Sequence, residues 1–299
     1  MNSQKNDPKS LAMNIAAMLI FGTIGVVRRQ IPLSSGFLAF TRGILGGLTI
    51  LAFMKLKGKS VRENLSRRQV LWLSATGAIM GINWILLFEA FEHTTVAVAT
   101  LCYYMQPTIV ILLSPLVFRE KLSLKKALCA AVAVAGMILV SGVIGGSGPR
   151  GGSVAGILLA LCAAVLYAAV IMMNKSQRIA GVNALQKTTV QLLSAGAVMI
   201  PWLVLSGGGP GAEWSPKVIV LVLTVGIVHT GIAYLLYFGS INGLRVQSIA
   251  ILSYIDPVSA LFFSALFLKE PLHPAGILGA LLVIGSAVLS EIPAKRTKG

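Results

Sequence analysis

The sequence predicts an all-α integral membrane protein, with ten transmembrane helices arranged as two inverted five-helix repeats around a central cavity. Composition is the first observation behind this prediction. Of the 299 residues, 56% are hydrophobic and only 11% are charged, whereas soluble domains carry about 25% charged residues. The second observation is that apolar residues form long runs instead of alternating with polar ones, which favours helices over a barrel. The third is an internal repeat, which predicts the two halves.

Ten apolar runs are long enough to cross a bilayer, because a helix needs roughly 20 residues to span about 30 Å of hydrocarbon. Glycine, proline and charged residues separate the runs. Polar tails at residues 1–10 and 292–299 flank them, and no inserted soluble domain is expected. The predicted spans are 11–28, 34–54, 69–91, 96–118, 123–144, 153–174, 184–206, 216–239, 246–268 and 273–291.

The basic residues indicate how these spans are oriented. An even number of spans puts both termini on one side, and if that side is the cytoplasm, 19 of the 25 Lys and Arg residues lie inside and 5 outside. We therefore expect a multi-pass protein of the cell (inner) membrane with both termini cytoplasmic. This bias and anionic lipid headgroups explain the net charge of +16 better than nucleic acid does, since no basic face stands clear of the membrane.

The two halves of the chain repeat each other at an offset of 150 residues, without a gap over the matched stretch. They are a five-helix unit at 11–145 and a second at 153–291. Because five is odd, the second unit enters the membrane upside down relative to the first. Inverted repeats are typical of secondary transporters, whose halves expose one central site to each side in turn. The matching residues are Gly81-Ile82 with Gly231-Ile232, Tyr104 and Pro107 with Tyr254 and Pro257, and Glu120 and Leu122 with Glu270 and Leu272.

Short motifs in both halves carry a family resemblance. They are Phe88-Glu-Ala-Phe91, Tyr104-Met-Gln-Pro107 and Phe118-Arg-Glu120-Lys-Leu122, with counterparts at Phe238, Tyr254-Ile-Asp-Pro257 and Phe267-Leu-Lys-Glu270-Pro-Leu272. Over nearly its whole length the chain resembles the EamA family of the drug/metabolite transporter superfamily, which includes ten-helix exporters of the YddG type. The resemblance implies a ten-helix bundle whose central cavity exports small metabolites, often amino acids, driven by gradients.

An acidic residue lies in the middle of the predicted span 246–268, where a charge is costly unless it is paired or hydrated. This residue, Asp256, immediately precedes Pro257, at which we expect the helix to bend. Asp256 is a candidate for proton coupling or for binding the amine of a substrate. The alternative is a structural acid held at the helix break. Its repeat counterpart is the neutral Gln106.

Arg42 and Glu89 are expected at similar depths in neighbouring spans, so the sequence predicts a buried ion pair between them. Arg42 also resembles the arginine usual in the second helix of the family. The pair is either a structural tie within the bundle or a carboxylate-binding arginine with Glu89 as its counter-ion. The repeat counterpart of Glu89 is Gly239, so the two halves differ here.

Aromatic residues inside the spans could line a cavity and bind an amphipathic ligand, or they could be ordinary helix packing. Two further polar residues, in spans 69–91 and 216–239, complete the set of substrate-binding candidates. Of these, His229 is either a satisfied interior group or a proton relay. The candidates are Arg42, Asn83, Trp84, Glu89, Tyr103, Tyr104, Gln106, His229, Tyr234, Tyr254 and Asp256.

Two glutamates recur at the ends of spans 96–118 and 246–268. Because helix N-termini have free amides, we expect Glu120 and Glu270 to accept hydrogen bonds from the helices that begin next, near Ser123 and His273. This interpretation gives both glutamates a structural role.

The function expected from these features is a secondary transporter, an exporter of small metabolites such as amino acids that works by alternating access. The alternatives are a membrane channel and a membrane-embedded enzyme. The chain carries no HExxH or GxSxG motif and no nucleotide-binding loop, and a channel is more naturally built from an oligomer with a ring of pore-lining residues. We expect a small-molecule substrate and the lipid bilayer as partners, no obligate protein partner, no metal, and no cofactor, with proton coupling as a candidate energy source.

Overall fold

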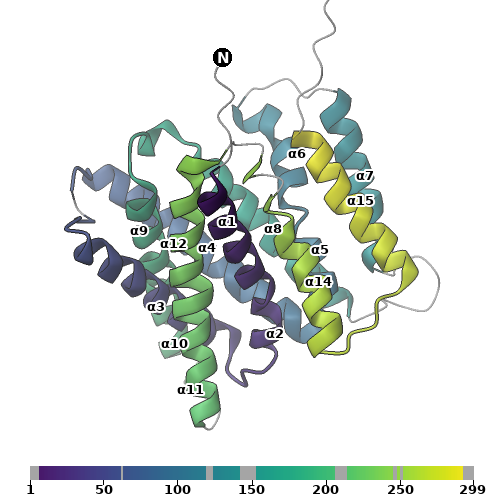
Figure 1. Ribbon diagram of the computed structural model, residues 1–299, viewed down its shortest axis with the longest axis horizontal. Helices are drawn as coiled ribbons and strands as arrows, with labels where there is room; N and C mark the ends of the chain where they lie inside the picture. The colour runs from purple at the N-terminus through teal and green to yellow at the C-terminus, as the bar shows by residue number, and fades with distance from the viewer. Residues whose placement is uncertain are drawn as a thin grey trace, which may run out of the picture.

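The protein is an assembly of packed helices, described by a computed structural model over residues 7–61, 63–118, 124–141, 153–205, 214–244, 248–249 and 252–291 (Figure 1). The helices of the first half are α1 (Pro8–Gly22), α2 (Ile24–Arg28), α3 (Ser35–Leu56), α4 (Arg67–His93), α5 (Val96–Tyr103), α6 (Gln106–Phe118) and α7 (Leu124–Ser141). Those of the second half are α8 (Val154–Asn174), η1 (Gln177–Ile179), α9 (Ala184–Ala197), α10 (Met199–Leu205), α11 (Pro216–Leu223), η2 (Thr224–Ile232), α12 (Ala233–Ser240), η3 (Ile241–Gly243), α14 (Ile255–Phe267) and α15 (Pro274–Glu291).

Six helical stretches in the described part of the chain are long and apolar enough to cross a membrane, and three further apolar helices are shorter. The protein is therefore a multi-pass membrane protein, while the count of ten spans and the inverted repeat stay predictions. The six stretches are Pro8–Arg28, Ser35–Leu56, Arg67–His93, Val96–Leu113, Val154–Asn174 and Pro216–Ser240, and the shorter helices are Ala127–Leu139, Ile255–Phe267 and Pro274–Ser286.

Several helices begin where a side chain can bind the free amides of the first turn. Ser66 and Gln69 form a capping box at the start of α4, and Asn183 and Gln186 form another at the start of α9. Asp7 caps α1, and the hydrogen bonds from the side chain and amide of Ser10 hold the pKa of this carboxyl below its usual value. These short polar residues explain why the apolar runs fold as helices from these points.

Two of the predicted spans are interrupted just before a proline. The helix α5 ends at Tyr103, and α6 begins one residue before Pro107. In the second half, α14 begins at Ile255, two residues before Pro257. Proline has no amide hydrogen for the preceding turn but fits the first turn of a helix, so each helix restarts at this point. The helix is thus interrupted just before Pro257, the proline at which a bend was expected.

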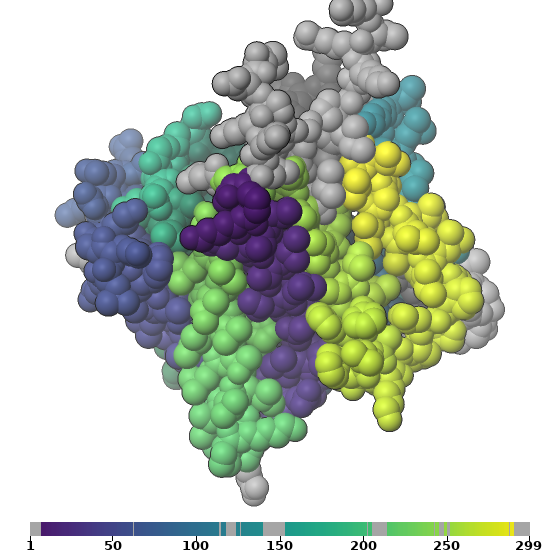
Figure 2. Space-filling view, viewed as in Figure 1, coloured from purple at the N-terminus to yellow at the C-terminus, as the bar shows by residue number. Residues whose placement is uncertain are grey.

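The helices pack as two groups around a centre that both halves share. In Figure 1, α7 and α15 pack against each other on one side of the bundle, while α3 and α9 lie on the other. Figure 2 shows the face on which α1 lies between α12 and α14. Large apolar side chains remain exposed on the outside, for example Leu116, Leu128 and Leu281, as a hydrocarbon environment permits.

Candidate functional site

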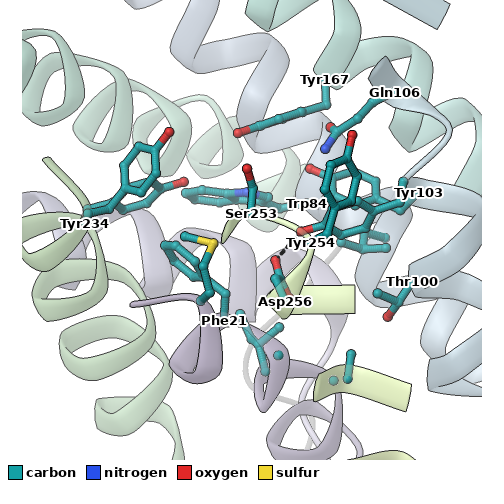
Figure 3. A pocket seen from close by; sticks show the side chains of 18 of the residues that line it. Phe21, Trp84, Thr100, Tyr103, Gln106, Tyr167, Tyr234, Ser253, Tyr254 and Asp256 are labelled. Atoms are coloured by element: carbon teal, nitrogen blue, oxygen red, sulfur yellow. Dashed lines mark hydrogen bonds between the residues drawn. The ribbon is translucent and has the colours of Figure 1, made fainter. Parts of the chain in front are cut away.

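A cavity of about 400 Å³ lies where α1, α3, α4, α8, α12 and the interrupted helices meet (Figure 3). Its volume is within the range of small-molecule sites. Aromatic rings make up much of its wall: Phe21, Trp84, Phe91, Tyr103, Tyr104, Tyr167, Tyr234, Tyr237, Phe238 and Tyr254.

Eight of the eleven residues selected from the sequence line this cavity, and their role in binding a substrate stays a prediction. They are Arg42, Trp84, Tyr103, Tyr104, Gln106, Tyr234, Tyr254 and Asp256. Sequence reasoning missed Tyr167 and Tyr237, although each is a tyrosine inside an apolar run and could have been selected on the same ground as Tyr234. It also missed Phe21, because a phenylalanine in a span carries no signal that separates it from lipid-facing residues.

Arg42 is a buried cation in the cavity wall, with 6% of its surface exposed. Its Nε donates a hydrogen bond to Thr230 Oγ1 at 2.9 Å, and its guanidinium carbon lies 4.2 Å from the ring centre of Trp84. The same carbon lies 5.6 Å from the ring centre of Phe88. Within the described part of the chain, the two terminal nitrogens have no hydrogen-bond or ion-pair partner. They are therefore available to a bound group.

The predicted ion pair between Arg42 and Glu89 is wrong. Glu89 accepts a hydrogen bond from Ser35 Oγ at 2.7 Å and lies 3.4 Å from Nε2 of His93. Ser35 precedes Arg42 by seven residues, which at 1.5 Å per residue is about 10 Å along α3. Glu89 thus lies level with the first turn of α3, about two turns away from Arg42, and its side chain is 43% exposed.

Asp256 is tied to the other half of the chain. Its Oδ2 accepts a hydrogen bond from the hydroxyl of Tyr104 at 2.5 Å, across 152 residues of sequence. Tyr104 is at the end of α5, and Asp256 is in the first turn of α14, so the bond joins the two interrupted helices. Arg42 lines the same cavity but forms no ion pair with Asp256 within the described residues. The cavity is therefore lined by one basic and one acidic side chain that do not form an ion pair with each other.

Gln106 contributes an unsatisfied acceptor. Its side-chain oxygen is buried and has no hydrogen-bond partner in the described part of the chain. The residue is 8% exposed and lines the cavity at the start of α6. A buried polar atom without a partner costs about 1–3 kcal/mol, so a donor on a bound molecule would remove this cost.

Comparison with known proteins identifies the family. The sequence profile described as the EamA-like transporter family matches residues 9–142 and again residues 154–291. The chain belongs to the EamA-like transporter family.

Two of the following three relatives of this EamA-like transporter are named as transporters. The uncharacterized transporter YxxF of Bacillus subtilis (strain 168) is 31% identical over 89% of this chain and 84% of its own length. The uncharacterized transporter YwfM of the same organism is 26% identical over 98% and 97%, and the protein PecM of Dickeya dadantii (strain 3937) is 29% identical over 77% and 76%. One solved crystal structure has the same fold, with a TM-score of 0.65, 20% identity, and coverage of 94% of this chain and 95% of that one.

Two other polar candidates of the EamA-like transporter lie outside the cavity lining. Asn83 donates to the carbonyl of Ala163 at 2.5 Å, and its side-chain oxygen lies 3.4 Å from the hydroxyl of Tyr103. Asn83 therefore contacts the cavity residue Tyr103 without lining the cavity itself. His229 has both ring nitrogens engaged, Nε2 with Thr23 Oγ1 at 2.8 Å and Nδ1 with the carbonyl of Thr224 at 3.2 Å. Of the two interpretations of His229, these contacts favour the satisfied interior group.

Glu270 of the EamA-like transporter binds a different helix from the one expected. Its carboxylate accepts hydrogen bonds from the amides of Val96 at 2.9 Å and Ala97 at 3.3 Å, in the first turn of α5, and Arg29 lies 3.8 Å away. The physical reason is the one predicted, a helix N-terminus with free amides, but the helix belongs to the first half of the chain. Its repeat counterpart Glu120 lies outside the described residues.

Proposed function

We propose that this EamA-like transporter exports amino acids as a secondary transporter of the cell inner membrane, with both termini cytoplasmic. The observation that carries the proposal is that a basic and an acidic side chain line one aromatic cavity: Arg42 and Asp256 both line it and bind other groups rather than each other. A free amino acid carries the two complementary charges close together, in a molecule small enough for about 400 Å³.

Each part of an amino acid has a matching group in this cavity. The terminal nitrogens of Arg42 can bind both oxygens of a carboxylate, which is the preferred geometry of a guanidinium. The ammonium group can donate to Asp256 and to the unpartnered oxygen of Gln106. The aromatic wall suits an apolar or aromatic side chain and also attracts a cation.

We also propose that transport proceeds by alternating access between two inverted halves of five spans each. Two features support this proposal: the family profile matches the chain twice, and each half has a helix interrupted before a proline. Interrupted helices beside a central site are a recurrent device of secondary transporters. The bond between Tyr104 and Asp256 links these two helices and so provides a contact through which substrate binding can reach both halves.

Asp256 is the group that we propose for proton coupling, because a proton and the substrate's ammonium would compete for the same carboxyl. The other titratable or charged groups that line the cavity are Arg42 on α3 and six tyrosines: Tyr103, Tyr104, Tyr167, Tyr234, Tyr237 and Tyr254. Loss of a proton from Asp256 on one side of the membrane would then allow the amine to bind there.

Purified protein in liposomes tests the proposed function. We expect saturable counterflow of amino acids, with labelled substrate accumulating against unlabelled substrate inside, and weak competition by the corresponding amino-acid amides, which lack the carboxylate. Ohmic conductance without counterflow would instead identify a channel. A thermal-shift screen of amino acids, nucleosides and amines would overturn the substrate class if only compounds without a carboxylate stabilise the protein.

A further inference from the structure

The segment of span 216–239 that faces Arg42 is a π-helix rather than an α-helix, over Thr224–Ile232. Two side chains in it bind carbonyls five residues earlier: Thr230 Oγ1 donates to Val225 at 2.9 Å, and His229 Nδ1 contacts Thr224 at 3.2 Å. In an α-helix a threonine hydroxyl reaches the carbonyl three or four residues back. The wider turn therefore places the hydroxyl of Thr230 near the carbonyl five residues earlier, which an α-helix would not do. Short π-helical turns occur frequently at functional sites.

Glycines bring this segment unusually close to α3. A side chain at Gly46 would overlap the methyl group of Thr230, and one at Gly226 would overlap Leu45. Gly46 lies four residues after Arg42, so the two share a face of α3. The close approach of the backbones at Gly46 places Thr230 within hydrogen-bond reach of Arg42, one turn away.

The hydroxyl of Thr230 can act on Arg42 only as an acceptor. It has a single hydrogen, which it donates to Val225, so its oxygen receives the Nε–H of Arg42 at 2.9 Å. Trp84 supports the face of the same guanidinium at 4.2 Å. One edge and one face of the planar group are thus held, and the two terminal nitrogens are left for the cavity.

We propose that Thr230 is a positioning residue, which orients the guanidinium of Arg42 so that its terminal nitrogens bind the carboxylate of the substrate. This inference rests on the proposed function and adds to it a residue outside the cavity lining that sets the preference for carboxylates. Thr49 provides a matched control. It lies at the same contact between α3 and η2, against Gly231, but among the described residues its hydroxyl binds only the carbonyl of Leu45 in its own helix.

Transport kinetics of three variants test the proposal. Thr230→Val removes the acceptor with little change in volume, and we expect the KM for the transported amino acid to rise about tenfold, equivalent to about 1.4 kcal/mol. Weak transport of the amino-acid amide should not change. Thr230→Ser keeps the hydroxyl and should therefore retain the wild-type KM, and Thr49→Val should leave the KM unaltered. An equal loss for the acid and the amide, or a Thr230→Ser variant as impaired as Thr230→Val, overturns the proposal.

A spectroscopic measurement keeps the proposal testable without transport. In protein labelled with fluorotryptophan, the Trp84 resonance is assigned by its loss in Trp84→Phe. We expect this resonance to shift in Thr230→Val, or in Thr230→Ala should the valine variant not fold, but not in Thr49→Val. An unchanged Trp84 resonance overturns the positioning role. Wild-type protein that moves no amino acid overturns the proposed function instead, and the resonance still reports whether Thr230 holds Arg42.

Discussion

Replacing Glu270 with alanine tests whether the last loop of the described chain stabilises α5. The carboxylate is 10% exposed and accepts two amide hydrogen bonds, at 2.9 and 3.3 Å, from the first turn of that helix. A hydrogen bond to a charged group contributes about 1.5–3 kcal/mol, and the longer of the two contributes less. The favourable position at a helix N-terminus adds about 0.3–1 kcal/mol, and the partly exposed pair with Arg29 adds about 0–1 kcal/mol.

The contribution of the helix N-terminus acts through the same two amides as the hydrogen bonds, so these contributions overlap and do not simply add. We therefore expect Glu270→Ala to lower the free energy of unfolding by about 2–4 kcal/mol. For a chain of this size the midpoint of thermal unfolding should fall by about 5–10 °C, measured by circular dichroism in detergent at one fixed scan rate. Glu63→Ala is the control, because Glu63 is exposed and its side chain has no partner within the described residues. Equal midpoints for the two variants would show that Glu270 does not stabilise α5 and would refute the reasoning.

Three further predictions concern the cavity and its support. Arg42→Lys should fold normally but raise the KM for amino acids about tenfold, because an ammonium cannot bind both carboxylate oxygens in one plane; an unchanged KM in liposomes would contradict the binding role. Asp256→Asn should remove the dependence of amino-acid flux on pH between about 5.5 and 8, and a retained pH profile would exclude Asp256 as the coupling group. Gly46→Ala should destabilise the protein by about 1–3 kcal/mol, because the added methyl group overlaps Thr230. Gly276→Ala is the control and should not destabilise it, because no atom lies within 4 Å of a methyl group added there. Similar unfolding midpoints for the two variants would contradict the close contact at Gly46.

Helix positions and the cavity's aromatic character were predictable from the sequence because both depend on local patterns. Apolar runs of sufficient length indicate spans, and Pro257 inside such a run indicates an interrupted helix, whatever that helix packs against. The tyrosines could be selected because a polar ring within an apolar run is conspicuous, and Tyr104 and Tyr254 do line the cavity.

Partners across the bundle were less predictable, because they depend on how each helix is rotated and what lies beside it. Counting residues from the helix ends placed Arg42 and Glu89 at similar depths, but the contact between Ser35 and Glu89 shows an offset of about two turns. Glu270 has the expected kind of partner on an unexpected helix. The π-helix has no sequence signal of its own, since Thr224–Ile232 is an ordinary apolar stretch whose wider turn is observed where glycines contact α3.

The bond between Glu270 and α5 also has a consequence for how the chain is assembled during synthesis. Val96 enters the membrane 174 residues before the carboxylate that will accept its amide hydrogen. At about 5–20 residues per second, the ribosome needs about 10–35 s to make the intervening chain. Throughout that interval the amides of Val96 and Ala97 must donate to water or lipid headgroups instead. The first turn of α5 therefore has to stay at the hydrated surface of the membrane until the segment with Glu270 is inserted. A ribosome stalled before residue 270 would leave the first helices inserted but without the hydrogen bonds between Glu270 and the start of α5.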